Sequence, residues 1–131
     1  MQRILVIDDE PFVLEALKRV LATTAVVVVA STADAGLTAM REAPVDLVII
    51  DVILPGMDGV AAIKLIRHDF PGVRIIAISG GGNFGLNSYL PDAISTSAYL
   101  AACKAAGADG VLAKPFETAE LRSLIDQVQA A

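Results

Sequence analysis

Residues 47–51 read LVIID, in which four apolar residues, Leu47 to Ile50, are followed directly by Asp51. No polar residue interrupts the apolar run, so it lacks the alternation of a strand with one wet face. A continuous run of strand length, rich in β-branched residues, is typical of a strand buried on both faces of a parallel sheet. We therefore expect a buried strand that carries Asp51 at its carboxyl end.

Runs of the same kind recur along the chain, with helical patterns between them. The other four expected strands are Ile4–Ile7, Val26–Val29, Ile75–Ile78 and Gly110–Ala113. The expected helices run over about 11–22, 31–40, 59–68 and 96–106, with a last one carrying Leu121, Leu124, Ile125 and Val128. Ser31 and Asp34 resemble a capping box at the start of the second helix. Five alternating strand–helix units with right-handed crossovers predict an α/β fold, a three-layer doubly wound (βα)5 parallel sheet.

Composition excludes several classes of protein. The 131 residues suit one domain, and 55% hydrophobic against 19% charged residues indicates a chain that folds. A net charge of −5 argues against a nucleic acid or an anionic membrane as the main partner. The single cysteine, Cys103, excludes an internal disulfide and a thiolate metal cage. No apolar run approaches the ~18 residues of a membrane span and no signal-peptide layout opens the chain, so we expect a cytoplasmic protein.

Polar side chains follow four of the five expected strands. They are Asp8, Asp9 and Glu10 after the first, Asp51 after the third, Ser79 after the fourth and Lys114 after the fifth. The carboxyl ends of parallel strands meet at one edge of such a sheet, where ligands bind. Carboxylates held close together repel and need a cation, and hard oxygen ligands favour Mg²⁺, with Mn²⁺ as an alternative. A cation, an ammonium and a hydroxyl meet the needs of a phosphoryl group, for which an aspartate can be the nucleophile.

Each of these residues also has a plainer interpretation when taken alone. The acidic residues 8–10 could cap the first helix, and Asp51 could cap a turn. Lys114 could be a solvated surface charge and Ser79 a turn residue. Their occurrence at four strand ends together favours one shared site.

The same residues carry a family resemblance. Asp51 is followed by VILPGMDG, and Lys114 by Pro115 and Phe116. With the Asp8–Asp9 pair and Ser79, these features resemble the receiver domain of bacterial two-component response regulators, of the chemotaxis-regulator type. The resemblance covers essentially the whole chain. It implies a single receiver domain over 1–131 with a flavodoxin-like fold and strand order 2-1-3-4-5.

The resemblance also implies roles at individual positions. Asp51 would be the phospho-acceptor, Lys114 would pair with the phosphoryl group, and Ser79 would hydrogen-bond it. Mg²⁺ would be held by Asp9, Asp51 and the backbone carbonyl of Ile53, with Asp8 acting through a water molecule. The Lys114–Pro115 peptide bond would be cis.

The implied function is a phosphorylation-dependent signalling switch. A histidine kinase or histidine phosphotransfer protein would supply the phosphoryl group, and the face formed by the fourth helix, fifth strand and fifth helix would contact a downstream protein that the sequence does not name. The chain would be no enzyme beyond its own phosphorylation and dephosphorylation at Asp51. We expect a monomer or weak dimer with no direct contact to nucleic acid or membrane.

Two departures from the family pattern, and two apolar positions beside the site, carry further expectations. Val111 occupies the position where the family usually has its switch aromatic residue. Tyr99 could substitute for that aromatic, or it could be an ordinary residue on the face of a helix. Lys114 lies 35 residues after Ser79, a longer spacing than is usual, and the surplus falls in a glycine-led loop at about 80–93. That loop is either a tolerated surface insertion or an element that alters partner choice. Ile53 and Gly81 flank the site without polar side chains, which predicts slow self-dephosphorylation.

Other readings of the same residues stay open at this point. A haloacid-dehalogenase-type phosphohydrolase also uses an aspartate and Mg²⁺, but its D-x-D-x-T pattern is absent from the first strand. A flavin carrier could use the glycines at 80–82, but the chain has no tryptophan to stack on a flavin. The receiver could also be excised from a longer regulator that has an output domain.

Overall fold

The computed structural model describes residues 2–54, 57–79 and 93–130, and at 53, 54, 57, 79, 93–97 and 99 it describes the backbone alone. Five parallel strands form one sheet in the order β2-β1-β3-β6-β7. They are β1 (Gln2–Ile7), β2 (Ala25–Ala30), β3 (Leu47–Asp51), β6 (Arg74–Ser79) and β7 (Gly110–Ala113). Since β6 and β7 are the fourth and fifth strands of this sheet, the predicted strand order 2-1-3-4-5 is confirmed.

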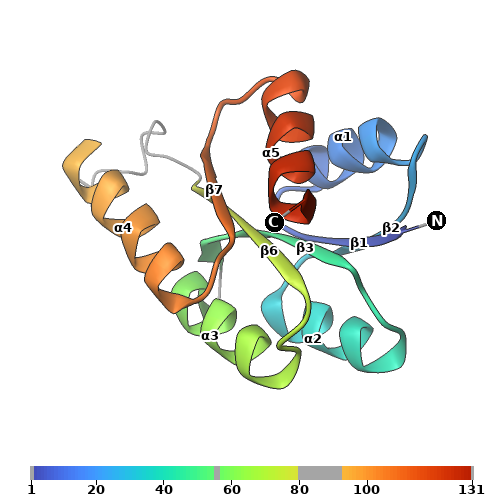
Figure 1. Ribbon diagram of the computed structural model, residues 1–131, viewed down its shortest axis with the longest axis horizontal. Coiled ribbons are helices and arrows are strands. Elements are labelled where there is room, and N and C mark those ends of the chain that lie inside the picture. Colours follow the sequence, from blue (N-terminus) through green and yellow to red (C-terminus); the bar gives the residue numbers. More distant parts are fainter. Residues whose placement is uncertain (1, 55–56, 80–92, 131) are drawn as a thin grey trace.

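Helices cover both faces of the sheet, so the predicted three-layer arrangement is also confirmed. The helices are α1 (Pro11–Leu21), α2 (Ala33–Glu42), α3 (Gly59–Asp69), α4 (Ala93–Ala106) and α5 (Thr118–Ala130). Figure 1 shows α1 and α5 on one face and α2, α3 and α4 on the other. Two short strands, β4 (Ile53–Leu54) and β5 (Met57–Asp58), pair antiparallel after β3 and were not expected from the sequence.

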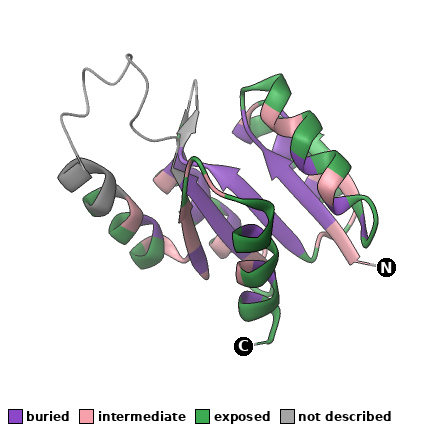
Figure 2. Cartoon of the chain, turned by 90° about the horizontal axis from the view of Figure 1, so that it is seen from above, coloured by how far each residue is buried: buried purple, intermediate pink, exposed green. Residues whose placement is uncertain are grey.

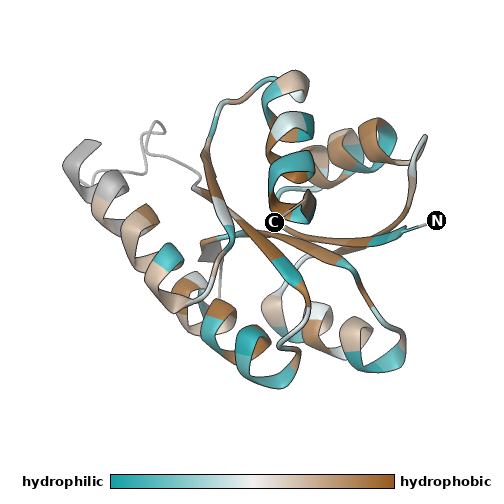
Figure 3. Ribbon diagram, viewed as in Figure 1, coloured by the Kyte–Doolittle hydropathy of each residue, from teal (hydrophilic) through white to brown (hydrophobic). Residues whose placement is uncertain are grey.

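The core consists of two apolar clusters separated by the sheet. One gathers β-strand residues such as Leu5 and Val48 against α2, α3 and α4, and the other gathers residues such as Ile4 and Ile49 against α1 and α5. Every residue of β3 is buried. Figures 2 and 3 show the buried, hydrophobic strands between helices whose outer faces are exposed and more polar. Among the described residues, no helix has the length and apolar character that a membrane crossing requires.

The strand β2 departs from the expectation of burial on both faces. Its run of four valines predicts an interior strand, yet Val26 and Val29 are 43% and 38% exposed. The reason is its place at the edge of the sheet, where β1 is its one strand neighbour. A run of apolar residues does not by itself reveal where a strand lies in the sheet order.

The start of α2 also differs from the expectation. The helix is capped by Thr32, whose hydroxyl accepts the N–H of Ala35 at 3.0 Å, and not by Ser31. Asp34 lies in the first turn, where its charge is favourable to the helix dipole. The predicted helix is therefore present, with its cap one residue further along the chain.

Candidate functional site

The site lies where β1 and β3 end side by side at the carboxyl edge of the sheet. Ile7 pairs with Ile50, so the residues that follow them, Asp8 and Asp51, come to the same edge. The N–H of Asp8 donates to the carbonyl of Ala30 at 3.1 Å, which ties the end of β1 to β2. Asp8 is 1% and Asp51 4% exposed, and they are the buried charged residues of the described chain.

Three carboxylates gather at this edge as the sequence predicts. One oxygen from each of Asp8, Asp9 and Asp51 lies within 4.8 Å of the other two. Asp9 is exposed, so the cluster opens to solvent on its side. Charged oxygen ligands at this spacing fit a small hard cation such as Mg²⁺, which takes one or two carboxylates and completes its shell with water.

Lys114 directly follows β7, and its side chain extends to the carboxylates at the ends of β1 and β3. Its ammonium donates to Asp8 Oδ2 at 3.0 Å, to Asp51 Oδ2 at 3.1 Å and to Glu10 Oε1 at 3.3 Å. Burial lowers the pKa of Lys114, but the charge of Asp51 and the hydrogen bond and charge of Asp8 outweigh it and hold this pKa above its ordinary value. The ammonium is therefore charged throughout the physiological range and offsets part of the negative charge of the cluster.

The chain closes a tight turn directly after Asp51. Val52 donates its N–H to the carbonyl of Ile78 at 3.0 Å and accepts the N–H of Gly59 at 3.1 Å. A Cβ on Gly59 would lie 2.2 Å from the Cα of Val52, so only glycine permits this approach. Asp58 then caps α3 by accepting the N–H of Val60 at 3.1 Å. Residues 55 and 56, which connect β4 to β5, lie outside the described residues.

Comparison with known proteins identifies this arrangement. The family model for the response regulator receiver domain matches residues 4–126. The chain belongs to the response regulator receiver domain family. Receiver domains are phosphoryl-accepting switches of two-component systems rather than classical enzymes, and they bind Mg²⁺ at an acidic pocket.

Curated relatives are response regulators of greater length. The chain is 32% identical to the transcriptional regulatory protein MctR of Rhizobium johnstonii, over 96% of this chain and 54% of that protein. It is 37% identical to the DNA-binding response regulator MtrA of Mycolicibacterium smegmatis, over 92% of this chain and 47% of that protein. The chain thus spans about half the length of the curated relatives that it matches.

Solved receiver structures share the fold over nearly the whole chain. A CheY-like receiver domain from Methanospirillum hungatei is 25% identical with a TM-score of 0.81, and the match covers 97% of this chain and 92% of that one. A LuxR-family regulator from Aurantimonas is 29% identical with a TM-score of 0.80, covering 98% and 84%. These likenesses agree with the observed strand order.

For Ser79 and Ile53, which are also expected in a receiver site, the structure describes the backbone and not the side chain. Ser79 ends β6 opposite Ala113, the residue before Lys114, so its backbone lies at the site edge, while its side chain is outside the description. Ile53 lies in β4 opposite Asp58, and its carbonyl stays a predicted ligand. The Lys114–Pro115 bond is cis, as the resemblance implies.

Of the positions that depart from the receiver pattern, Val111 is described in full. Val111 is half-buried, pairs with Ala77 across the sheet and packs on the cluster beneath α4. Tyr99 lies in α4, where its side chain is not described, and the loop at 80–92 lies outside the described residues. The contact of Glu10 with Lys114 was not predicted from the sequence, although Glu10 directly follows the acidic pair.

Proposed function

We propose that this receiver accepts a phosphoryl group on Asp51 and uses it as a signalling switch. The donor is the phosphohistidine of a histidine kinase or histidine phosphotransfer protein. The observation that supports this role most strongly is the meeting of buried Asp51 with Lys114 at 3.1 Å beside two further carboxylates. That arrangement supplies a nucleophile, a fixed positive charge and a place for a cation within one edge of the sheet.

Each side chain of the site has a separate role in the transfer of the phosphoryl group. A carboxylate oxygen of Asp51 forms a bond to phosphorus as the bond from phosphorus to the donor imidazole breaks, and the imidazole leaves with the electron pair. Lys114 places its ammonium against the developing charge. Asp9, Asp51 and the carbonyl of Ile53 would hold Mg²⁺ directly, with Asp8 acting through a water molecule. The ion, when bound, neutralises charge on the transferring oxygens. The Ser79 hydroxyl would donate to a phosphoryl oxygen after transfer.

The output of this switch is a change in protein contacts. We place it on the face formed by α4, β7 and α5, with a downstream protein as partner. Val111 on that face cannot supply an aromatic rotamer signal, which leaves Tyr99 in α4 to be tested as its substitute. The loop at 80–92 is a second proposed determinant of partner choice, tested by deleting residues 83–91 and measuring phosphotransfer and partner binding.

The assignment of the acceptor is tested by phosphorylation with a small phosphodonor or a panel of kinases from the host. The wild-type chain should gain one phosphoryl group in the presence of Mg²⁺, and Asp51→Asn should gain none. Asp126→Asn, an exposed aspartate on α5, is the matched control and should be labelled normally. Labelling of Asp51→Asn at the wild-type rate would exclude Asp51 as the acceptor. Ile53 and Gly81 stand where other receivers can carry polar side chains, so we expect the phosphoryl group to last far longer than seconds.

A second candidate is the receiver of a longer regulator with an output domain. The curated relatives favour this candidate, because the chain matches only about half of the length of each. An antibody to this receiver, used on extracts of the native host, would distinguish the two by the size of the product.

A further inference from the structure

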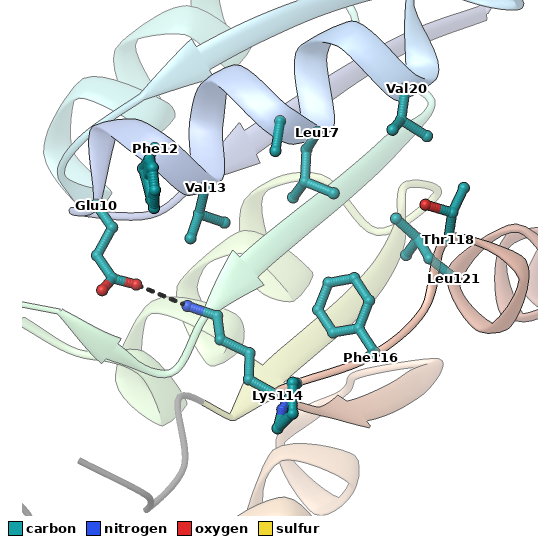
Figure 4. A pocket seen from close by; sticks show the side chains of 11 residues that line it. Glu10, Phe12, Val13, Leu17, Val20, Lys114, Phe116, Thr118 and Leu121 are labelled. Carbon is teal, nitrogen blue, oxygen red and sulfur yellow. Dashed lines mark hydrogen bonds and ion pairs between the residues drawn. The ribbon is translucent and has the colours of Figure 1, made fainter.

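Glu10 is the third carboxylate on the ammonium of Lys114, and it stands apart from the cation cluster. Among the described residues, that cluster consists of Asp8, Asp9 and Asp51. The side chain of Glu10 is 50% exposed, against 1% for Asp8 and 5% for Asp51. Figure 4 shows Glu10 reaching Lys114 from the start of α1, at one end of the apolar groove beneath that helix. Glu10 therefore meets the site through Lys114, from the solvent side.

The backbone of Glu10 is held firmly where α1 begins. Its N–H donates to Asp8 Oδ1 at 2.9 Å, and its carbonyl accepts the N–H groups of Val13 and Leu14 at 3.0 and 3.2 Å. A residue at this N-cap position usually turns its side chain to the first helical turn. The Glu10 side chain makes no capping bond, and it contacts Lys114 instead. The fold thus directs a carboxylate at the ammonium of Lys114, which also contacts Asp51.

We infer that Glu10 is a positioning residue that competes with the phosphoryl group for Lys114, an inference that rests on the proposed function. An ammonium has three N–H donors, and all three of Lys114 are directed at carboxylates. A phosphoryl group on Asp51 has to take over one of them. The Glu10 contact is the longest and most exposed of the three, so it is the one most readily exchanged.

The charge of Glu10 acts in opposite directions on the two ligands of the site. A further negative charge next to Asp8 and Asp51 attracts a divalent cation and repels an anionic phosphoryl group. Removing this charge should therefore weaken cation binding and strengthen binding of a phosphoryl mimic. A residue that only supported the fold would change both affinities in the same direction.

The test is calorimetric titration of Glu10→Gln with MgCl₂, and then with beryllofluoride, an anionic phosphoryl mimic, at saturating Mg²⁺. For a half-exposed charge we expect the Kd for Mg²⁺ to rise ~3- to 10-fold and the Kd for beryllofluoride to fall by a similar factor. Glu15→Gln removes the same charge from an exposed position on the same helix and should leave both values unchanged. Glu10→Asp keeps the charge and should stay near wild type for Mg²⁺.

Two results would overturn the role of Glu10 while leaving the proposed function intact. One is a loss of both affinities in Glu10→Gln, and the other is behaviour identical to Glu15→Gln. A wild-type chain that binds neither Mg²⁺ nor beryllofluoride would overturn the proposed function, and the role of Glu10 with it.

Discussion

Lys114 Nζ lies 3.1 Å from Asp51 Oδ2, and the two side chains are only 11% and 5% exposed. The two residues come from the ends of β7 and β3, which are separated in the sheet by β6. Asp8 adds a second buried carboxylate at 3.0 Å from the same nitrogen. One ammonium therefore offsets two buried carboxylates, a balance that leaves the site attractive to a further cation and sensitive to the loss of either partner.

Replacing Lys114 with alanine should destabilise the fold. The change leaves Asp8 and Asp51 buried without their cation, and removal of one partner of a buried ion pair costs about 3 kcal/mol or more. Urea unfolding in EDTA buffer measures the change. Lys64→Ala, at an exposed position on α3, should shift the free energy of unfolding by no more than about 0.5 kcal/mol. Equal effects of the two substitutions would show that the Lys114 ion pairs contribute little.

Mg²⁺ should stabilise the folded chain through the carboxylate cluster. At a Mg²⁺ concentration of about 100 times Kd, binding to the folded state alone adds about 2.7 kcal/mol to the free energy of unfolding. Asp9→Asn replaces a cluster carboxylate on the exposed side with a neutral amide, so most of this increment should disappear. Asp126→Asn should retain it. An increment that persists in Asp9→Asn would place the cation elsewhere.

Gly59→Ala should disrupt the turn after Asp51 without altering any charge. The new Cβ would lie 2.2 Å from the Cα and 2.3 Å from the carbonyl oxygen of Val52, which is buried and cannot move aside. We expect a loss of at least ~2 kcal/mol in unfolding free energy, together with slower labelling of Asp51. Gly72→Ala is the matched control, because nothing lies within 4 Å of its added Cβ. A Gly59→Ala chain as stable as Gly72→Ala would contradict the close approach.

The site could be predicted because it depends on strand ends. Asp8, Asp51 and Lys114 each follow an apolar run, and a parallel sheet brings the carboxyl ends of its strands to one edge whatever the details of the packing. The Glu10 contact depends on the direction of one flexible side chain, which a sequence pattern does not encode. The exposure of Val26 depends on the position of β2 in the strand order, and its run of valines resembles that of an interior strand. Ser31 and Thr32 can both cap a helix, and the point where β2 ends decides between them.

The single thiol should be unreactive and should make stability fall at alkaline pH. Cys103 is fully buried in α4, and burial, with a smaller contribution from the charge of Asp58, raises its pKa from 9.0 to about 11. The folded state therefore favours the protonated thiol. This contribution to stability is complete below pH 9 and is lost as the pH rises toward and through 11.

The comparison of wild type with Cys103→Ala isolates that effect, because both chains share the titration of Lys114. The stability advantage of wild type over Cys103→Ala should shrink by about 2 kcal/mol between pH 8 and pH 11. A disulfide reagent at pH 8 should label the folded thiol far more slowly than the urea-unfolded one, since the thiolate is the reactive form. Stabilities that change with pH in the same way for the two chains would show that the folded state does not favour the protonated thiol. Rapid labelling of the folded protein would show that the thiol is not shielded.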